Sequence, residues 1–120
     1  TIEVARRDTL SKELISQAEA VDYIVTLLDT IQENLFQKAM EMRVSLTHEA
    51  EDYEQFKRLL EEKGGFVWAH WDGTTETEER IKAETKATIR CIPLDGPVTP
   101  GKCILTGKNS SRKVLFARAY

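Results

Sequence analysis

The sequence predicts an α+β domain, a two-layer βαβαββ sandwich with helices on one face of a mixed sheet, preceded by a long linking helix. Three observations predict this fold class. The chain has 120 residues, of which 41% are hydrophobic and 31% charged, so it can bury the core of one domain. Residues 17–43 carry apolar side chains at three- and four-residue steps. Beyond residue 43, short apolar runs alternate with two further amphipathic segments.

The first segment, residues 1–7, is expected to form a short strand that ends at the turn-prone pair Asp8-Thr9. No partner strand is evident nearby, so this strand is interpreted as the edge of a preceding domain. Because the chain starts at Thr1, within that strand and without Met, we expect it to be a piece of a longer protein.

The long helix is expected from about residue 17 to residue 43, a length of about 40 Å. Ser16 and Glu19 have the spacing of a capping box at its start, with Ser16 serving the backbone N–H of Glu19. Two roles fit such a helix, packing between two domains or forming a dimeric coiled coil. We favour packing because the apolar spacing is not a sustained heptad, since Val25, Leu27 and Phe36 widen the stripe beyond the main apolar positions. The main positions are Val21, Ile24, Leu28, Ile31, Leu35 and Met42.

A second helix is expected to follow a short strand at residues 44–49. Asp52 is placed to cap its first turn, with Gln55 three residues later. The pair Gly64-Gly65 is expected to end it, because glycine adopts the left-handed conformation that ends many helices.

The third helix lies between two expected strands. Residues 66–71 are rich in aromatic side chains and predict a strand that ends at the turn Asp72-Gly73. The segment Thr75–Glu78 has capping-box spacing and opens a helix over residues 76–84.

The remaining residues predict strands joined by loops. Residues 87–92 are expected to form a strand, and residues 93–102 hold all three prolines and predict a loop. Residues 103–105 are expected to be extended and residues 107–111 to turn. Residues 113–120 are apolar on both faces, which predicts a final strand in a central or well-covered position.

Net charge narrows the possible functions. The formal charge is −3 and the sequence pI is near 5.5, which argues against a dedicated nucleic-acid binder. After Asp95, however, no acidic residue occurs, and five basic residues follow. We interpret them as solvated strand and turn charges, with a locally positive face as the alternative. They are Lys102, Lys108, Arg112, Lys113 and Arg118.

Cysteine usage indicates a reducing setting. Cys91 and Cys103 have no CxxC or zinc-finger spacing, so a disulfide framework is not expected. No apolar run is long enough for a membrane span and no signal-peptide pattern opens the chain. We therefore expect a cytoplasmic protein without a membrane partner.

No motif predicts a catalytic site from the residues alone. Phe66 and Trp68 lie on one face of their strand and Trp71 on the other, which fits either a base-stacking platform or, as we favour, core packing. His48 and His70 are isolated and have no metal-site spacing. The acidic residues of the third helix alternate with basic ones and predict a solvated face.

Four stretches of the second half form a longer pattern: Gly64–Val67, Ile81–Pro93, Gly101–Ile104 with Gly107-Lys108, and Val114–Tyr120. They resemble the C-terminal domain of the archaeal- and eukaryotic-like class of prolyl-tRNA synthetase. Residues 2–9 resemble the closing strand of the anticodon-binding domain that precedes it. The resemblance therefore implies three parts: 1–10 as the remnant of that strand, 11–43 as the linking helix and 44–120 as the C-terminal domain.

The resemblance also implies a function for the longer protein. That family activates proline with ATP and Mg²⁺ to prolyl-adenylate and transfers proline to tRNA-Pro, in a parent enzyme expected to be a homodimer. Its catalytic core is expected upstream of Thr1, so this fragment is expected to hold no catalytic residue and no cofactor. Its expected partner is the remainder of the synthetase chain, whose catalytic and anticodon-binding domains it supports.

In that family the domain commonly holds a structural zinc through four cysteines, in the pattern Cys-x4-Cys followed by Cys-x2-Cys. Carried over from the matching motifs, these positions fall on Asp72, Thr77, Cys103 and Thr106, while Cys91 matches a cysteine that is not a ligand. Only one thiol remains and threonine is a poor zinc ligand, so zinc is expected to be absent. Asp72 and Thr77 are expected to cap the third helix instead, and Thr106 to stabilise its turn.

Tyr120 is a further candidate site residue. In the family the carboxylate of the C-terminal tyrosine reaches back toward the active site, which implies a positioning role for Tyr120; the alternative is that it only ends a strand. A competing function for the whole chain is an autonomous RNA-binding or adaptor module. Its basic C-terminal quarter and a βαβαββ layout that resembles the C-terminal domain of a bacterial initiation factor favour that reading.

Overall fold

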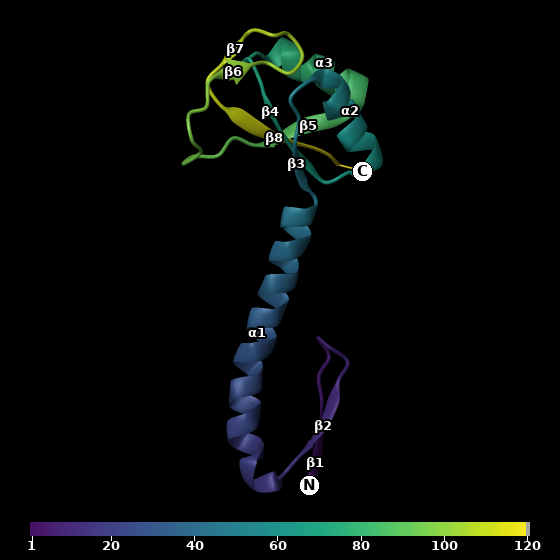
Figure 1. The fold of residues 1–120 in the computed structure, drawn as a ribbon, viewed down its shortest axis with the longest axis vertical. Coiled ribbons are helices and arrows are strands. Elements are labelled where there is room, and N and C mark those ends of the chain that lie inside the picture. The colour runs from purple at the N-terminus through teal and green to yellow at the C-terminus, as the bar shows by residue number, and fades with distance from the viewer. Residues whose placement is uncertain (120) are drawn as a thin grey trace. The chain divides into compact units, whose positions relative to one another are not determined.

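The structure is a computed structural model that describes residues 1–119 (Figure 1). It divides into two compact units, Thr1–Met42 and a second unit that begins at Arg43. Within the described residues, none of the helices combines the length and apolar character that crossing a membrane requires.

The first unit opens with a hairpin. Strand β1 (Ile2–Ala5) pairs antiparallel with β2 (Lys12–Ile15), so the expected first strand has a partner that the sequence did not predict. The turn between them holds an ion pair, in which the Arg6 guanidinium lies 2.7 Å from the Asp8 carboxylate. Hydrogen bonds from Arg6 and then Asn34 hold the pKa of Asp8 well below its usual range, although desolvation opposes them.

Helix α1 (Ala20–Ser45) follows a short 3₁₀ turn at Gln17–Glu19. The expected capping pair forms in a different way, because the Ser16 hydroxyl donates to the Glu19 carboxylate at 2.6 Å and caps no backbone N–H. The Asn34 amide and the Lys38 ammonium both donate to Asp8, which ties the helix to the hairpin turn. Large apolar side chains nevertheless remain exposed along α1, among them Val21, Ile24, Val25, Leu28, Leu35 and Phe36.

The second unit is built on a four-stranded sheet in the order β3-β4-β8-β5. Its strands are β3 (Thr47–Glu49), β4 (Phe66–His70), β5 (Ala87–Cys91) and β8 (Lys113–Arg118). Strands β3 and β4 are parallel and the other pairs antiparallel, which confirms the mixed sheet of an α+β domain. Strand β8 lies between β4 and β5, as its apolar sequence predicted.

A small hairpin stands apart from this sheet. It pairs β6 (Gly101–Lys102) with β7 (Asn109–Ser110). The prediction of an extended segment at residues 103–105 is wrong, because these residues begin the turn of this hairpin. That turn is closed by the Gly107 N–H, which donates to the Cys103 carbonyl at 3.0 Å.

Local signals explain where the two shorter helices begin and end. Helix α2 (Tyr53–Glu62) starts as predicted, with the Gln55 N–H donating to the Asp52 carboxylate at 2.8 Å. At its end Gly65 has φ of 72°, and a Cβ there would lie 2.2 Å from a backbone oxygen. Helix α3 (Thr75–Thr85) is capped by Thr74, whose side chain accepts a hydrogen bond from the Thr77 N–H, so the capping residue is neither the predicted Thr75 nor Asp72 or Thr77.

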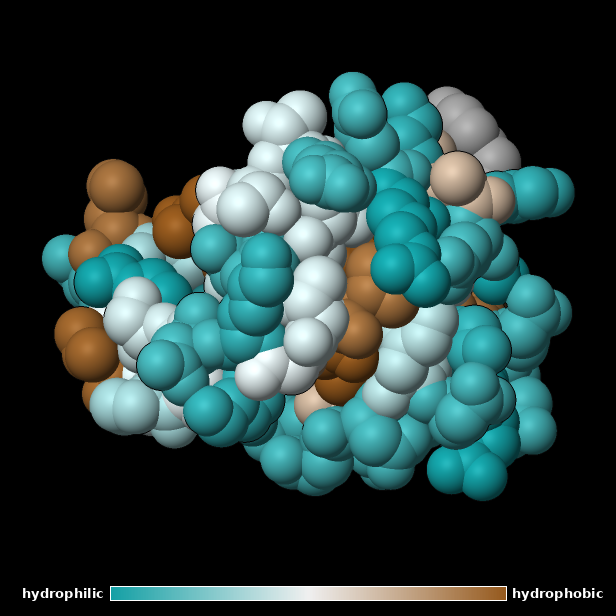
Figure 2. All heavy atoms as spheres, turned by 90° about the horizontal axis from the view of Figure 1, so that it is seen from above, coloured by the Kyte–Doolittle hydropathy of each residue, from teal (hydrophilic) through white to brown (hydrophobic). Residues whose placement is uncertain are grey.

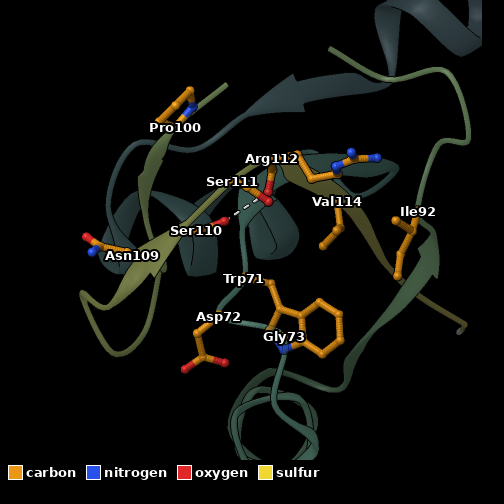
Figure 3. A pocket seen from close by; sticks show the side chains of 10 residues that line it. All are labelled: Trp71, Asp72, Gly73, Ile92, Pro100, Asn109, Ser110, Ser111, Arg112 and Val114. Atoms are coloured by element: carbon orange, nitrogen blue, oxygen red, sulfur yellow. Dashed lines mark hydrogen bonds between the residues drawn. The ribbon is translucent and has the colours of Figure 1, made fainter. Parts of the chain in front are cut away.

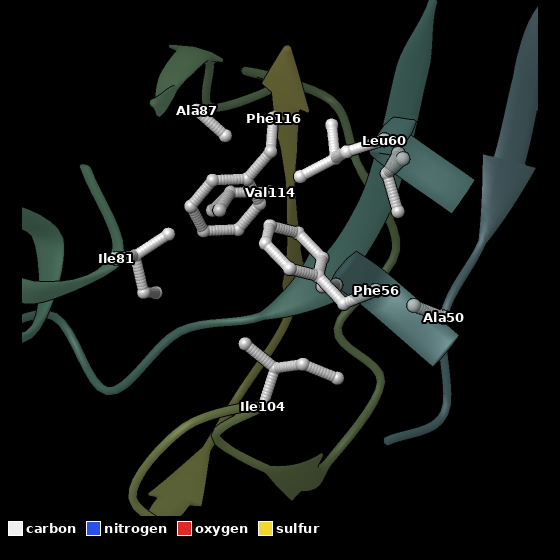
Figure 4. Close-up of a cluster of buried hydrophobic side chains, with 10 residues drawn as sticks. Ala50, Phe56, Leu60, Ile81, Ala87, Ile104, Val114 and Phe116 are labelled. Carbon is white, nitrogen blue, oxygen red and sulfur yellow. The ribbon is translucent and has the colours of Figure 1, made fainter. Parts of the chain in front are cut away.

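Both helices pack on one face of the sheet around a shared core (Figure 4). Phe56 of α2 and Phe116 of β8 are fully buried, and their rings meet edge to face at 5.1 Å. The prediction that aromatic side chains of residues 66–71 pack in the core holds for Trp71, which packs against this cluster. It is wrong for Phe66 and Trp68. Those two side chains alternate with the buried Val67 and Ala69 and so lie on the other face.

Candidate functional site

A polar cluster lies directly after β4, where the chain turns into α3. One Asp72 oxygen accepts hydrogen bonds from the Thr74 N–H at 3.1 Å and the Thr74 hydroxyl at 2.8 Å. The other accepts from the hydroxyls of Thr77 at 2.8 Å and Thr106 at 2.9 Å. We call Asp72, Thr74, Thr77 and Thr106 the Asp72 clasp. It joins the start of α3 to the β6–β7 hairpin through a single carboxylate.

The local sequence explains both halves of the clasp. Gly73 has φ of 84°, a conformation that glycine adopts without strain and that lets the turn after β4 close tightly. Thr74 then caps α3 by accepting a hydrogen bond from the Thr77 N–H at 3.3 Å. On the other side, the Cys103 N–H donates to the Lys108 carbonyl at 2.7 Å, which holds the turn that carries Thr106.

The Asp72 carboxylate is ionised at neutral pH. Partial burial raises its pKa, but hydrogen bonds from Thr74, Thr77 and Thr106 together outweigh that effect and lower the pKa from 3.8 to about 2. Hydrogen bonds to a carboxylate favour its charged form, which is a stronger acceptor than the neutral acid. The negative charge also lies at the N-terminus of α3, where the helix dipole stabilises it.

The structure brings together three of the four positions that match family zinc ligands. Asp72, Thr77 and Thr106 are in direct contact, and Cys103 begins the same turn as Thr106 and is only 4% exposed. These residues do not fit a tetrahedral zinc site. The Thr77 and Thr106 hydroxyls donate their protons to the Asp72 carboxylate, which accepts four hydrogen bonds in all. Among residues 1–119 no group of three or more His, Cys, Asp or Glu could hold a metal ion. Tyr120 lies outside the described residues.

A second polar contact, between His70 and Ser110, was not predicted. The Ser110 hydroxyl donates to the Arg112 carbonyl at 3.0 Å and lies 2.9 Å from His70 Nδ1, so the ring donates to the hydroxyl oxygen. This direction is the reverse of an activated serine, whose proton must face the imidazole. Forty residues separate the pair in sequence, so no local spacing could have indicated it.

A hollow of about 820 Å³ opens beside this contact (Figure 3). Trp71, Ile92 and Val114 supply its apolar walls, and Figure 3 shows the three side chains facing a common space. The indole N–H of Trp71 donates to the Thr74 carbonyl at 3.0 Å, which fixes the ring. We find no pairing of nucleophile and base among the described side chains that line this hollow.

The basic C-terminal quarter is largely engaged within the fold. Lys113 lies 3.0 Å from the Glu49 carboxylate, and Arg118 lies 2.7 Å from the Glu61 carboxylate. Lys102 donates to the Asn109 side chain at 2.6 Å. These contacts support the interpretation of solvated strand and turn charges.

Comparison with known proteins places these observations in a family. The family model described as "Prolyl-tRNA synthetase, C-terminal" matches residues 53–120. The chain is similar to the proline–tRNA ligases of Porphyromonas gingivalis, at 62% identity, Azobacteroides pseudotrichonymphae, at 58%, and Cytophaga hutchinsonii, at 57%. Each match covers the whole chain but only 24% of the relative, so the chain spans about a quarter of the length of these relatives.

Proposed function

This chain belongs to the family of prolyl-tRNA synthetase C-terminal domains, and we propose that it is the non-catalytic C-terminal domain of a proline–tRNA ligase. The family match over residues 53–120 carries this proposal. The reaction belongs to the longer protein, which activates proline with ATP and Mg²⁺ to prolyl-adenylate and then charges tRNA-Pro. The motifs that resemble the archaeal- and eukaryotic-like class support placing the parent in that class, and by the same resemblance we propose a cytoplasmic homodimer.

The first unit favours a role in supporting the other domains of the parent. A two-stranded hairpin is marginally stable alone, and an exposed apolar helix face is stabilised by covering it. The exposed side chains of α1 therefore suit a linking helix within residues 11–43, and strand β1 suits residues 1–10 as the end of an anticodon-binding domain, whose hairpin partner β2 lies at residues 12–15. Residues 44–120 form the C-terminal domain itself.

The Asp72 clasp suggests that this domain is a metal-free member of its family. A zinc site would join the turn after β4 to the β6–β7 turn, and the clasp makes that connection with hydrogen bonds from Thr77 and Thr106 to one carboxylate. Elemental analysis of the purified longer protein is expected to find far less than one zinc per chain. A stoichiometric zinc that survives dialysis against a chelator would contradict the metal-free assignment.

Aminoacylation by the longer protein tests the main proposal. With ATP and Mg²⁺ it is expected to attach proline to tRNA-Pro, and a variant that lacks residues 44–120 is expected to lose most of this activity. If the longer protein charges tRNA with another amino acid, or with none, the assignment is wrong.

Deletion of Tyr120 alone tests its positioning role. We expect slower formation of the adenylate with unchanged unfolding of the domain.

The alternative function, an autonomous RNA-binding or adaptor module, rests on the basic C-terminal quarter. Pairing of Lys113 and Arg118 with carboxylates weakens it, because phosphate affinity needs uncompensated cations. Filter binding of the 120-residue chain to tRNA separates the two readings. Micromolar, salt-sensitive binding would favour the module.

A further inference from the structure

The sheet of the second unit has helices on one face only, and its other face carries large apolar side chains beside the polar Thr47, Glu49 and Lys113. Phe66 and Trp68 project from β4 on this side, and Trp68 lies directly across from Leu115 of β8. On the next strand Cys91 lies across from Leu115 and is exposed. We call Phe66, Trp68, Cys91 and Leu115 the open face.

The open face is hollowed. Its four side chains contribute to a hollow of about 580 Å³, whose remaining lining comes from Arg43, Val44 and the polar residues of β3. A second hollow, of about 250 Å³, lies between Trp68 and the loop after β5. That loop exposes apolar side chains of its own, namely Ile92, Leu94 and Val98. Figure 2 shows hydrophobic spheres at the left edge of the molecule, where the loop projects in Figure 1.

Such a surface indicates contact with another protein part. Antiparallel strands with one solvated face normally place polar side chains on it, and a concave apolar surface with aromatic side chains is typical of an interface. We propose that the open face docks against the part of the parent chain that precedes this fragment. The proposal rests on the proposed function, since relatives about four times longer supply the missing partner.

Charge favours a protein partner over RNA. At the rim of the open face, Lys113 lies 3.0 Å from the Glu49 carboxylate and 3.7 Å from that of Glu51. Two carboxylates therefore face one ammonium, so Lys113 adds no positive excess to the rim, while Arg43 lines the larger hollow and Arg112 the smaller one. Hydrogen bonds to Glu49 raise the pKa of Lys113, with desolvation opposing, which keeps the pair charged and mutually neutralised. A phosphate backbone would need cations that are not already paired.

Shape argues against a second copy of the chain. A two-fold dimer places the same patch on both partners, so the hollow of one open face would meet the hollow of the other and stay unfilled. A different part of the parent chain can instead present a convex apolar surface. Contacts between domains of one chain typically bury about 600 to 1,500 Å².

The reactivity of the Cys91 thiol reports whether the open face is covered. In the purified longer protein we would measure alkylation by N-ethylmaleimide at each cysteine with peptide-resolved mass spectrometry. The control is a thiol introduced by Glu79→Cys, on the exposed side of α3, with rates in urea correcting for intrinsic reactivity. We expect Cys91 to react at least about tenfold more slowly than the control, although both positions are exposed in this chain.

A second variant shows that docking causes the protection. Trp68→Arg places a charge on the open face and is expected to bring the Cys91 rate to that of the control. Cys103, which is buried, must stay unreactive in this variant, because its protection reports that the domain remains folded. Equal rates at Cys91 and at the Glu79→Cys control in the protein that keeps Trp68 would overturn the proposal.

RNA or a second copy of the chain on the open face would give a different pattern of Cys91 alkylation. Protection that appears only when tRNA is added would assign the face to RNA, and protection that grows with protein concentration would assign it to a second copy. Either result would refute docking within the chain. Proline charging by the same preparation is measured separately, so failure of the docking proposal is distinguishable from failure of the proposed function.

Discussion

Substitution Asp72→Asn tests the clasp because it keeps the shape of the side chain and removes its charge. The amide retains one acceptor oxygen and turns the other into a donor, so it can keep at most two of the four hydrogen bonds. Since the folded pKa lies near 2 against 3.8, and the site is partly solvated, we expect a loss of about 1 to 2 kcal/mol of unfolding free energy at pH 7.

Urea unfolding followed by tryptophan fluorescence measures this loss, because both tryptophans lie in the second unit. Asp95→Asn, which removes an exposed loop carboxylate, is the matched control and should change the free energy of unfolding little. Thr106→Val removes the hydrogen bond from the β6–β7 turn to Asp72, together with a long one that Thr106 accepts from the Lys108 N–H at 3.4 Å, and is expected to cost about 1 kcal/mol. Identical stability of Asp72→Asn and the control would refute the clasp.

The pH dependence has a definite sign. A carboxylate whose pKa is lower in the folded state stabilises the fold fully above its unfolded pKa of 3.8 and loses that effect as pH falls through about 2. The difference between the unmodified chain and Asp72→Asn should therefore be constant above about pH 5 and shrink below pH 4. A difference that grew on acidification would mean that the carboxylate is not stabilised by its donors.

Three further outcomes follow from the structure. Gly65→Ala should destabilise the second unit by about 2 kcal/mol or more in urea unfolding, because the residue has φ of 72° and its new Cβ would clash with backbone. Phe116→Ala should cost about 3 to 5 kcal/mol by the same measurement, since the ring is fully buried against Phe56. Restoring thiols beside Cys103 should create a cobalt(II) site with thiolate charge-transfer absorption, which the unmodified chain should lack. The substitutions are Asp72→Cys, Thr77→Cys and Thr106→Cys.

Sequence patterns predicted the features that depend on neighbouring residues. The cap of α2 depends on Asp52 and Gln55, three residues apart, and it forms as expected. The central position of β8 follows from apolar side chains on both of its faces. Strand β2 was missed because it has only four residues, two of them charged, and because it forms through pairing with β1.

Side-chain size was a misleading guide to the core. Alternation correctly grouped Phe66 with Trp68, but it does not say which of the two faces is buried. We expected the large aromatic side chains inside, whereas the small residues Val67 and Ala69 face the helices. The reason is geometric, since Phe56 and Phe116 already fill the space between helix and sheet.

The geometry of the clasp could not be predicted from neighbouring residues in the sequence. Asp72 and Thr106 are 34 residues apart, and their meeting depends on the hairpin turn that Cys103 and Gly107 close. A metal site fixes such distant segments through a few strong bonds, whereas the clasp distributes the same connection over several weaker ones. Loss of any one threonine hydroxyl should therefore weaken the domain without unfolding it, while loss of the whole Asp72 side chain would remove all four hydrogen bonds to it at once. The acid, and not the three hydroxyl donors, is the residue on which the connection depends.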